Sequence, residues 1–289
     1  GDRAVAIGAD VSQSGDVERL FETAAARFGE LRFVINNAGI IRDRTCKKMS
    51  DGEWQMRVDL AACYRLIAHY EMDDLFATHI SARIPGADEH FLINQLGMLF
   101  SQVTASSLVK VDLAGNVIWP RGALINPAGY VIHSAVHQAR PDVIAAAHSH
   151  SVHGKAFSSL GIPLDPITQD SCVFYEDHVV VTAQRGRVQF DIDDGRELVA
   201  QFPKGKAAIH QNHGLFTVGT TVDEAAFWFL SMDRSCQAQL LAMAAGEPTL
   251  IPHDDAVYTR EQTASPIAGW LSFQPLWNEI CRTDPDLFE

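Results

Sequence analysis

Two histidines separated by a single residue, His148 and His150, follow the apolar run 143–147. Side chains two apart in an extended strand project from the same face, so this spacing predicts two imidazoles side by side. A third imidazole, His213, precedes Gly214 at an expected turn much further along the chain. Three imidazole nitrogens can hold a divalent metal and leave one position open to water or substrate, as in catalytic zinc sites. The alternative is that all three are ordinary buried or loop histidines.

Groups able to transfer a proton lie between the paired histidines and His213. They are a carboxylate, a phenol and an imidazole, which near a bound metal could act as general acid or base. The sequence therefore predicts a divalent metal, with zinc as the expected ion, on His148, His150 and His213, and candidate catalytic groups in Asp170, Tyr175 and His178.

The composition indicates a globular protein and limits its partners. Of the 289 residues, 47% are hydrophobic and 20% are charged, as in ordinary folded domains. The formal net charge of −13 argues against nucleic acid or an anionic membrane as the main partner, which leaves a small-molecule substrate or ligand. The five cysteines are scattered without a C-x-x-C pair, so they indicate free thiols in a reducing compartment and a cytoplasmic location.

The first 49 residues have the order of a small β-α-β unit. Apolar residues predict strands at 4–7 and 31–35, with helical spacing between residues 17 and 28. Together with Asn36-Asn37-Ala38-Gly39, this segment resembles the middle of a short-chain dehydrogenase. A glycine-rich first turn for a pyrophosphate and a Tyr-x-x-x-Lys pair are both missing. We therefore expect residues 1–49 to be a truncated dehydrogenase-like segment without NAD-dependent reductase activity.

Residues 50–250 contain alternating helix and strand signals, which predict one α/β domain. Ser50 with Glu53, and Thr221 with Glu224, are capping boxes that begin two helices, the second of which ends at Gly246. Residues 251–289 are expected to form a C-terminal docking tail. Strands are predicted at 78–83, 91–94, 109–112, 116–119, 143–147 and 206–210, the last being the final core strand, and further helices at 126–138 and 152–157.

Residues 53–250 resemble the class II aldolase and adducin head family, because several short motifs occur in the family's order. The resemblance implies a three-layer α/β/α domain with a mainly antiparallel central sheet. It also implies a cyclic homotetramer with zinc or another divalent metal near a subunit interface, and enzymes that cleave sugar phosphates or epimerise or decarboxylate related acids. The motifs are Leu60–Leu66, Thr78-His79-Ile80-Ser81, Asn126-Pro127, Arg140-Pro141-Asp142, His148-Ser149-His150 and Asn212-His213-Gly214.

The chain also departs from the family pattern. The sugar-phosphate aldolases of the family carry an acidic base nineteen residues before the first histidine of the pair, and that position is Gly129 here. The two serines that hold phosphate just before it are replaced by Pro127 and Ala128, and an expected asparagine is His79. Without a carboxylate near the substrate, ordinary aldol cleavage loses its proton acceptor.

A cluster of hydroxyl residues, Thr104–Ser107, has two interpretations. Hydroxyls and backbone N–H groups at such a turn can bind phosphate, but serine and threonine also favour turns and caps for local reasons. The second interpretation is favoured, and Ala105 stands where the family pattern has glycine.

Two functions remain open from the sequence. The first is a metal-dependent lyase acting on a small hydroxy-carbonyl compound without a strong phosphate site. The second is a non-catalytic, adducin-like interaction module that keeps the fold and the metal as structure. The absent base and phosphate ligands motivate the second.

Overall fold

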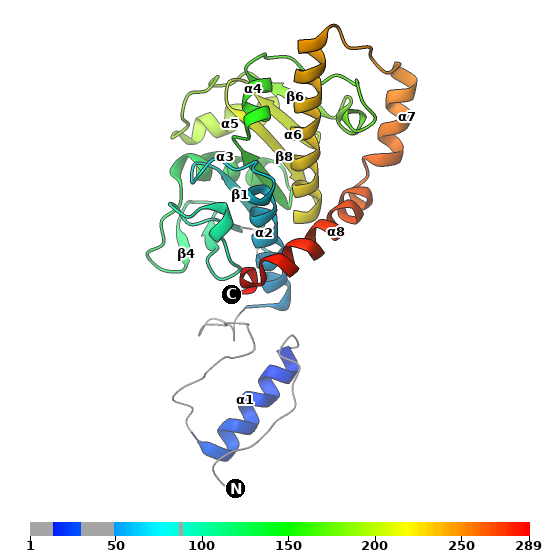
Figure 1. Cartoon of the computed structure of the whole chain (residues 1–289). Helices are drawn as coiled ribbons and strands as arrows, with labels where there is room; N and C mark the ends of the chain where they lie inside the picture. Colours follow the sequence, from blue (N-terminus) through cyan, green and yellow to red (C-terminus); the bar gives the residue numbers. More distant parts are fainter. Residues whose placement is uncertain (1–13, 30–48, 87–88) are drawn as a thin grey trace.

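The computed structural model describes residues 14–29, 49–86 and 89–289. Its centre is an eight-stranded sheet in the order β4-β3-β2-β1-β5-β8-β7-β6 (Figure 1). Neighbouring strands are antiparallel, except that β6 and β7 are parallel. The strands are β1 (His79–Arg83), β2 (His90–Ile93), β3 (Val109–Asp112), β4 (Val117–Trp119), β5 (Ala145–Ser149), β6 (His178–Val181), β7 (Ala207–His210) and β8 (Gly214–Gly219).

Helices cover both faces of this sheet. On one face lie α2 (Asp51–His69), α4 (Val152–Ser158), α6 (Val222–Ala245) and α8 (Pro266–Thr283), whose apolar residues form the larger core cluster. On the other face, α3 (Pro127–Ala139) and α5 (Ile192–Gln201) enclose a second cluster. This arrangement confirms the predicted three-layer α/β/α domain with a mainly antiparallel sheet.

The central strand β5 contributes to both cores. Ala145 and Ala147 belong to the cluster under α2 and α6, and Ala146 belongs to the cluster under α3 and α5. Because successive side chains in a strand alternate, His148 shares the α3 and α5 face with Ala146. On the neighbouring strand β1, Ile80 packs into the larger cluster, so His79 points to the same face as His148.

Most predicted helix boundaries agree with the structure. The Ser50 and Thr221 side chains accept hydrogen bonds from the backbone N–H groups of Glu53 and Glu224, as N-caps of α2 and α6 do. The Asn126 side chain caps α3 in the same manner.

The prediction that residues 206–210 form the final core strand was wrong. Strand β8 follows β7 after a three-residue turn, and β6 and α5 were not predicted either. All six residues of β8 are buried, so the strand shows none of the alternation that marks a half-exposed strand.

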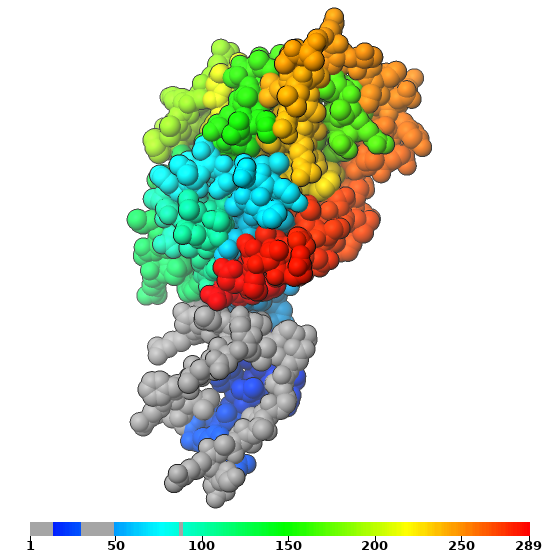
Figure 2. All heavy atoms as spheres, in the orientation of Figure 1, coloured from blue at the N-terminus to red at the C-terminus, as the bar shows by residue number. Residues whose placement is uncertain are grey.

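The two ends of the chain contribute no strand to the sheet within the described residues. Helix α1 (Ser14–Phe28) has no buried residue, and the strands predicted at 4–7 and 31–35 fall outside the described residues. After α6, helix α7 (His253–Thr263) leads to α8, which packs against α2 and α6. In Figure 2 the C-terminal residues, in red, lie against this body. Among the described helices, none has the length and apolar character needed to cross a membrane.

The hydroxyl cluster Thr104–Ser107 forms a self-contained turn. Thr104 and Ser107 exchange hydrogen bonds between their side chains and backbone. The backbone N–H groups of Ala105 and Ser106 donate to the carbonyl oxygens of Leu287 and Glu289. The donors that a phosphate would need are therefore used to fix the C-terminus, which agrees with the favoured interpretation of these residues.

Candidate metal centre

His148 and His150 are placed by a central strand of the sheet. β5 is hydrogen-bonded to β1 on one side and to β8 on the other, with His148 opposite His79 and Phe216. His150 follows directly after the strand ends at Ser149. The predicted side-by-side arrangement is present, since the two ring centroids lie 5.0 Å apart.

His213 reaches the pair from the turn between β7 and β8. Asn212 has a φ of 59°, a left-handed conformation that asparagine adopts more readily than most residues. After the turn, Gly214 passes so close to β5 that a Cβ atom on it would lie 2.9 Å from the carbonyl oxygen of Ser149. The His-Gly sequence is therefore needed to bring the third imidazole against the other two.

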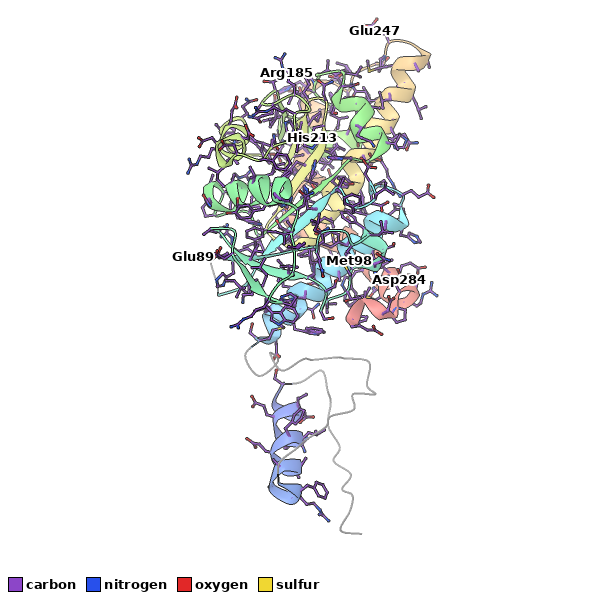
Figure 3. All side chains as sticks on the ribbon, turned by 90° about the vertical axis from the view of Figure 1, so that its left-hand side faces the viewer. Glu89, Met98, Arg185, His213, Glu247 and Asp284 are labelled. Atoms are coloured by element: carbon purple, nitrogen blue, oxygen red, sulfur yellow. The ribbon has the colours of Figure 1, made fainter. Side chains whose placement is uncertain are left out.

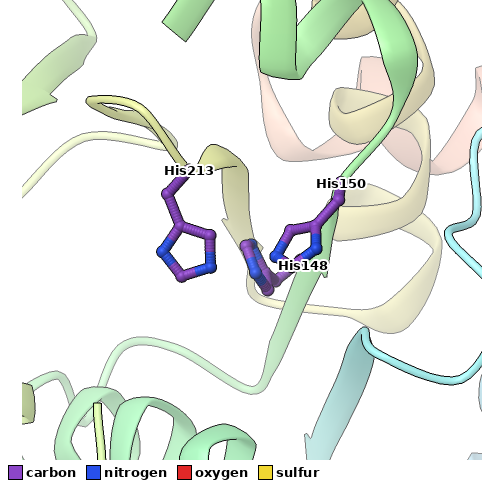
Figure 4. Close-up of side chains that lie close together, drawn as sticks. All are labelled: His148, His150 and His213. Carbon is purple, nitrogen blue, oxygen red and sulfur yellow. The ribbon is translucent and has the colours of Figure 1, made fainter. Parts of the chain in front are cut away.

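The three imidazoles converge, as Figure 4 shows. Each offers a ring nitrogen, and these atoms all lie within 4.8 Å of one another. The His213 ring centroid is 4.9 Å from that of His148 and 4.8 Å from that of His150. Figure 3 places His213 inside the body of the domain, with Arg185 towards its periphery.

Hydrogen bonds on the outer side select which nitrogens face inward. Nδ1 of His148 donates to the carbonyl oxygen of Leu215 at 2.8 Å, which leaves Nε2 as a lone-pair donor. Nδ1 of His150 lies 3.5 Å from Oδ2 of Asp74. His210, whose ring centroid is 4.6 Å from that of His213, is itself fixed by a 2.7 Å hydrogen bond from Nε2 to the carbonyl oxygen of Ala183.

The donor set fits a divalent metal. Nε2 of His148, Nε2 of His150 and Nδ1 of His213 are buried and make no hydrogen bond within the part of the chain that the structure describes. Burial, reinforced by the neighbouring imidazoles, lowers the pKa of His148 well below its usual range and that of His213 to about 3. Burial also lowers the pKa of His150, against the opposing effect of Asp74. All three rings are therefore neutral at pH 7, the form that binds metal.

A second group of histidines adjoins the triad formed by His148, His150 and His213, and it was not predicted to be functional. The His79 ring lies over that of His148, with centroids 5.4 Å apart and ring planes inclined by 27°. Behind it, the Ser81 hydroxyl joins Nδ1 of His133 at 2.6 Å and Nε2 of His137 at 2.8 Å. His133 and His137 are four residues apart on α3, which is a helical-face signal, but only the sheet register could place His79 and Ser81 beside them.

The candidate catalytic residues Asp170, Tyr175 and His178 lie elsewhere in the same chain. Asp170 precedes the short helix η3 (Ser171–Phe174) and is exposed. The Tyr175 hydroxyl bonds Nδ1 of His253 at 3.0 Å. His178 pairs with Ala207 at the start of β7. The chain continues for three more residues, about 10 Å along the strand, before β7 ends and leads to the turn that carries His213.

His178 already has two backbone partners. Its Nδ1 donates to the carbonyl oxygen of Phe174, and its Nε2 accepts from the N–H of Leu164. The chain therefore brings the three predicted metal ligands together, whereas the contacts found for Asp170, Tyr175 and His178 among the described residues are with other parts of the chain.

The N-terminus of α3 has no free serine hydroxyls for a phosphate. The Asn126 side chain accepts from the backbone N–H groups of Ala128 and Gly129, at 3.0 Å and 3.5 Å. Pro127 supplies no N–H group. The first backbone N–H groups of α3 are therefore used by the helix cap.

Comparison with known proteins identifies the family that this fold and site define. Residues 58–240 match the family described as the class II aldolase and adducin N-terminal domain, and residues 1–70 match the short-chain dehydrogenase family. The chain belongs to the class II aldolase and adducin family, preceded by a short dehydrogenase-like segment. Both resemblances drawn from the sequence are thus confirmed.

Individual relatives have different activities in their names. The chain is 41% identical to decarboxylase NovR of Streptomyces niveus, over 75% of this chain and 80% of the relative. It is similar to the structure of an L-fuculose 1-phosphate aldolase from Glaciozyma antarctica PI12, with a TM-score of 0.77, 36% identity and coverage of 87% and 98% of the two chains. An aldolase II superfamily protein from Pseudomonas syringae gives a TM-score of 0.79 with 36% identity, over 86% of this chain and all of that one.

Proposed function

We propose that this protein is a divalent-metal-dependent lyase acting on a small hydroxy-carbonyl compound without a phosphate group. The observation that carries the proposal is the set of three buried, converging ring nitrogens on His148, His150 and His213 that have no partner among the described residues. Zinc is the expected ion, because neutral imidazoles are among its preferred ligands. A bound divalent ion would polarise the carbonyl and hydroxyl oxygens of such a compound and stabilise negative charge that develops on them.

Among lyase reactions, decarboxylation fits these residues best. Aldol cleavage requires a base that removes a proton from the substrate, and Gly129 supplies none. In decarboxylation the bond to the carboxyl carbon breaks, CO2 leaves, and a carbonyl group beta to the carboxylate accepts the electron pair. A proton is then added at carbon, so no base acts before the bond breaks. The similarity to decarboxylase NovR supports this choice.

The proposal assigns proton delivery to Asp170, Tyr175 or His178 of a neighbouring copy. Within one chain the contacts found for these residues are with other parts of the fold, so we propose that they act across the interface of a homo-oligomer, the tetramer implied by the family. Exposure of Asp170 is compatible with this role. His178 is the weakest of the three candidates, because both of its ring nitrogens are already hydrogen-bonded to backbone.

A second candidate is the adducin-like interaction module. It is favoured by the same Gly129 and by the loss of the phosphate-binding serines, since neither change matters to a protein that performs no chemistry. The two candidates differ in whether the metal-loaded protein turns over any substrate.

Elemental analysis of the purified full chain is the first test. We expect about one divalent ion per chain, lost in His148→Ala and retained in His69→Ala, whose imidazole is exposed on α2. A wild-type protein without a stoichiometric divalent ion would refute the metal site.

Turnover is the second test. The lyase proposal predicts CO2 release from a panel of 2-hydroxy-3-oxo acids by the metal-loaded wild type and not by His148→Ala. If metal is bound but neither CO2 release nor proton exchange on dihydroxyacetone exceeds that of the metal-free protein, the interaction module is the better description.

A further inference from the structure

His79 is held in a fixed position beside the predicted metal ligands. It is opposite His148 in the β1–β5 register and stacks over that ring. Its other side meets the edge of His133 on α3, with centroids 5.3 Å apart and planes inclined by 86°. His79 is only 3% exposed, so its ring is wedged between a metal ligand and the helix that covers this face of the sheet.

The ring of His79 also fills the space that a side chain at position 129 would need. A Cβ atom built on Gly129 would lie 2.3 Å from Cδ2 and 2.6 Å from Cγ and Nε2 of His79. Real Cβ atoms do not approach other atoms so closely, so residue 129 can carry no side chain while the His79 ring is there. Position 79 is histidine where the family pattern has asparagine, and position 129 is glycine where it has an acidic residue. Together, these two residues place an imidazole next to His148, in space that a side chain from α3 would otherwise need.

One nitrogen of this imidazole is unused by the protein. Nδ1 of His79 is buried and makes no hydrogen bond with any residue in the described ranges. Buried polar groups in native proteins nearly always have partners, so one without a partner requires an explanation such as a functional role or a bound molecule. A neutral imidazole carries one N–H group, which can donate to an oxygen of a bound molecule.

The charges around the triad favour an anionic ligand. The three triad imidazoles contribute no charge when neutral. The carboxylate of Asp74, which lies beside His150, is also paired with Nζ of Lys155 at 3.1 Å, so its negative charge is offset. A divalent ion would therefore keep most of its positive charge. Such a charge attracts a ligand that brings a carboxylate more strongly than a neutral hydroxy-ketone.

We propose that His79 determines the class of substrate: it donates a ring N–H to the carboxylate of a small hydroxy-carbonyl acid whose neighbouring oxygens face the triad. This inference rests on the proposed function, because it requires a metal on His148, His150 and His213. His79 is thus a binding and specificity residue for substrates that carry a carboxylate. The space that its ring occupies excludes a carboxylate side chain at position 129.

The test compares two ligands that share a hydroxy-ketone and differ in one group. Hydroxypyruvate carries a carboxylate where dihydroxyacetone carries a hydroxymethyl group. Each is titrated into the Co²⁺-loaded full chain while the visible spectrum of the metal is followed, so the readout is binding and not turnover. We expect hydroxypyruvate to bind the wild type at least about tenfold more tightly than dihydroxyacetone, as a hydrogen bond to a charged group implies.

The variant His79→Phe keeps the ring volume against Gly129 and removes both nitrogens. It should lose about tenfold or more in hydroxypyruvate affinity, with dihydroxyacetone affinity changed less than about twofold. His69→Phe, at an exposed position on α2, is the matched control and should behave as wild type. Equal affinities of wild type and His79→Phe for hydroxypyruvate would overturn the inference while leaving the metal site in place.

A second pair of variants tests the packing of His79 against Gly129 independently, in case His79→Phe does not fold. Gly129→Glu alone should lower the melting temperature of the metal-free protein, and His79→Ala combined with Gly129→Glu should recover most of the loss, because the ring that collides with residue 129 is gone. A Gly129→Glu protein as stable as wild type would overturn the volume argument. Failure of the wild type to bind Co²⁺ at all would overturn the proposed function and this inference with it.

Discussion

Oδ2 of Asp74 lies 3.5 Å from Nδ1 of His150 and 3.1 Å from Nζ of Lys155. The carboxylate therefore stands behind a predicted metal ligand, where such groups orient the ring and raise its basicity. The loop that carries Asp74 is fixed to the metal-bearing strand, since the Ser149 hydroxyl donates to the carbonyl oxygen of Met72 at 2.6 Å.

Asp74→Asn should weaken metal binding without removing it. We expect a loss of about 10- to 100-fold in affinity, the range found when such supporting carboxylates are replaced. Competition with a chromophoric chelator measures the affinity, and Glu71→Gln, exposed in the same loop, is the control. An unchanged affinity in Asp74→Asn would show that His150 needs no support from this carboxylate.

The buried serine bridge between His133 and His137 should be visible as stability. Ser81→Ala leaves a nitrogen on each ring without its partner, so we expect a loss of about 1–3 kcal/mol in the free energy of unfolding. Urea denaturation measures the loss. Ser159→Ala removes an exposed hydroxyl bound to the carbonyl oxygen of Ala156 and should cost less than about 0.5 kcal/mol. Equal losses in the two variants would contradict a role for the bridge.

Acid should destabilise the metal-free protein through its buried histidines, of which His133 and His137 are two that bind no metal in the proposal. Burial, with smaller effects of His137 and Arg83 respectively, lowers the pKa of His133 and of His137 to about 3. In the unfolded chain each takes a proton near pH 6.5, whereas in the folded chain neither does until about pH 3. Stability is therefore lost as the pH falls from about 6.5 towards 3, by at most about 1.4 kcal/mol per pH unit for each histidine.

The variant His137→Gln isolates one part of this dependence. Its unfolding free energy should fall less steeply than that of wild type between pH 6.5 and pH 5, because one of the histidine protonations linked to unfolding has been removed. Urea titrations at the two pH values provide the comparison. Parallel losses in wild type and variant would mean that acid acts at other groups.

Two carboxylic acids should give a pH dependence of the opposite sign. Burial raises the pKa of Asp59 to about 6 and, together with the Asp59 charge, raises that of Asp223 to about 7. The folded chain keeps protons that the unfolded chain releases near pH 4, so stability is lost as the pH rises from about 4 to about 7. Asp223→Asn should raise the melting temperature at pH 8 by about 2–4 °C, after discounting for partial exposure, and change it little at pH 4. A similar shift at both pH values would exclude the proposed ionisation.

The metal ligands could be predicted from the sequence because their geometry is local. The spacing of His148 and His150 fixes a common side in any extended strand, and His213-Gly214 marks a turn. The only long-range step was to bring the turn to the strand, and the family resemblance supplied it.

The residues that surround the ligands could not be predicted in this way. His79 reaches His148 through the register of β1 on β5, and Asp74 reaches His150 through a loop fixed by Ser149 and Lys155. Nothing in the spacing of these residues indicates either contact. Asp170, Tyr175 and His178 were chosen for their chemistry, and within one chain the fold leads them towards α7 and the far end of β6 instead.

The attachment of the triad has a consequence for the kinetics of metal exchange. His148 belongs to a strand bonded on both sides, and its neighbour His150 follows directly, whereas His213 belongs to a three-residue turn at the rim of the sheet. Local opening of such a turn needs far less free energy than opening of a central strand. The turn 211–213, which is held by hydrogen bonds from Gln211 to Val181 and from Asn212 to Ser158, is therefore the part of the triad whose opening would limit how long His148, His150 and His213 could hold an ion.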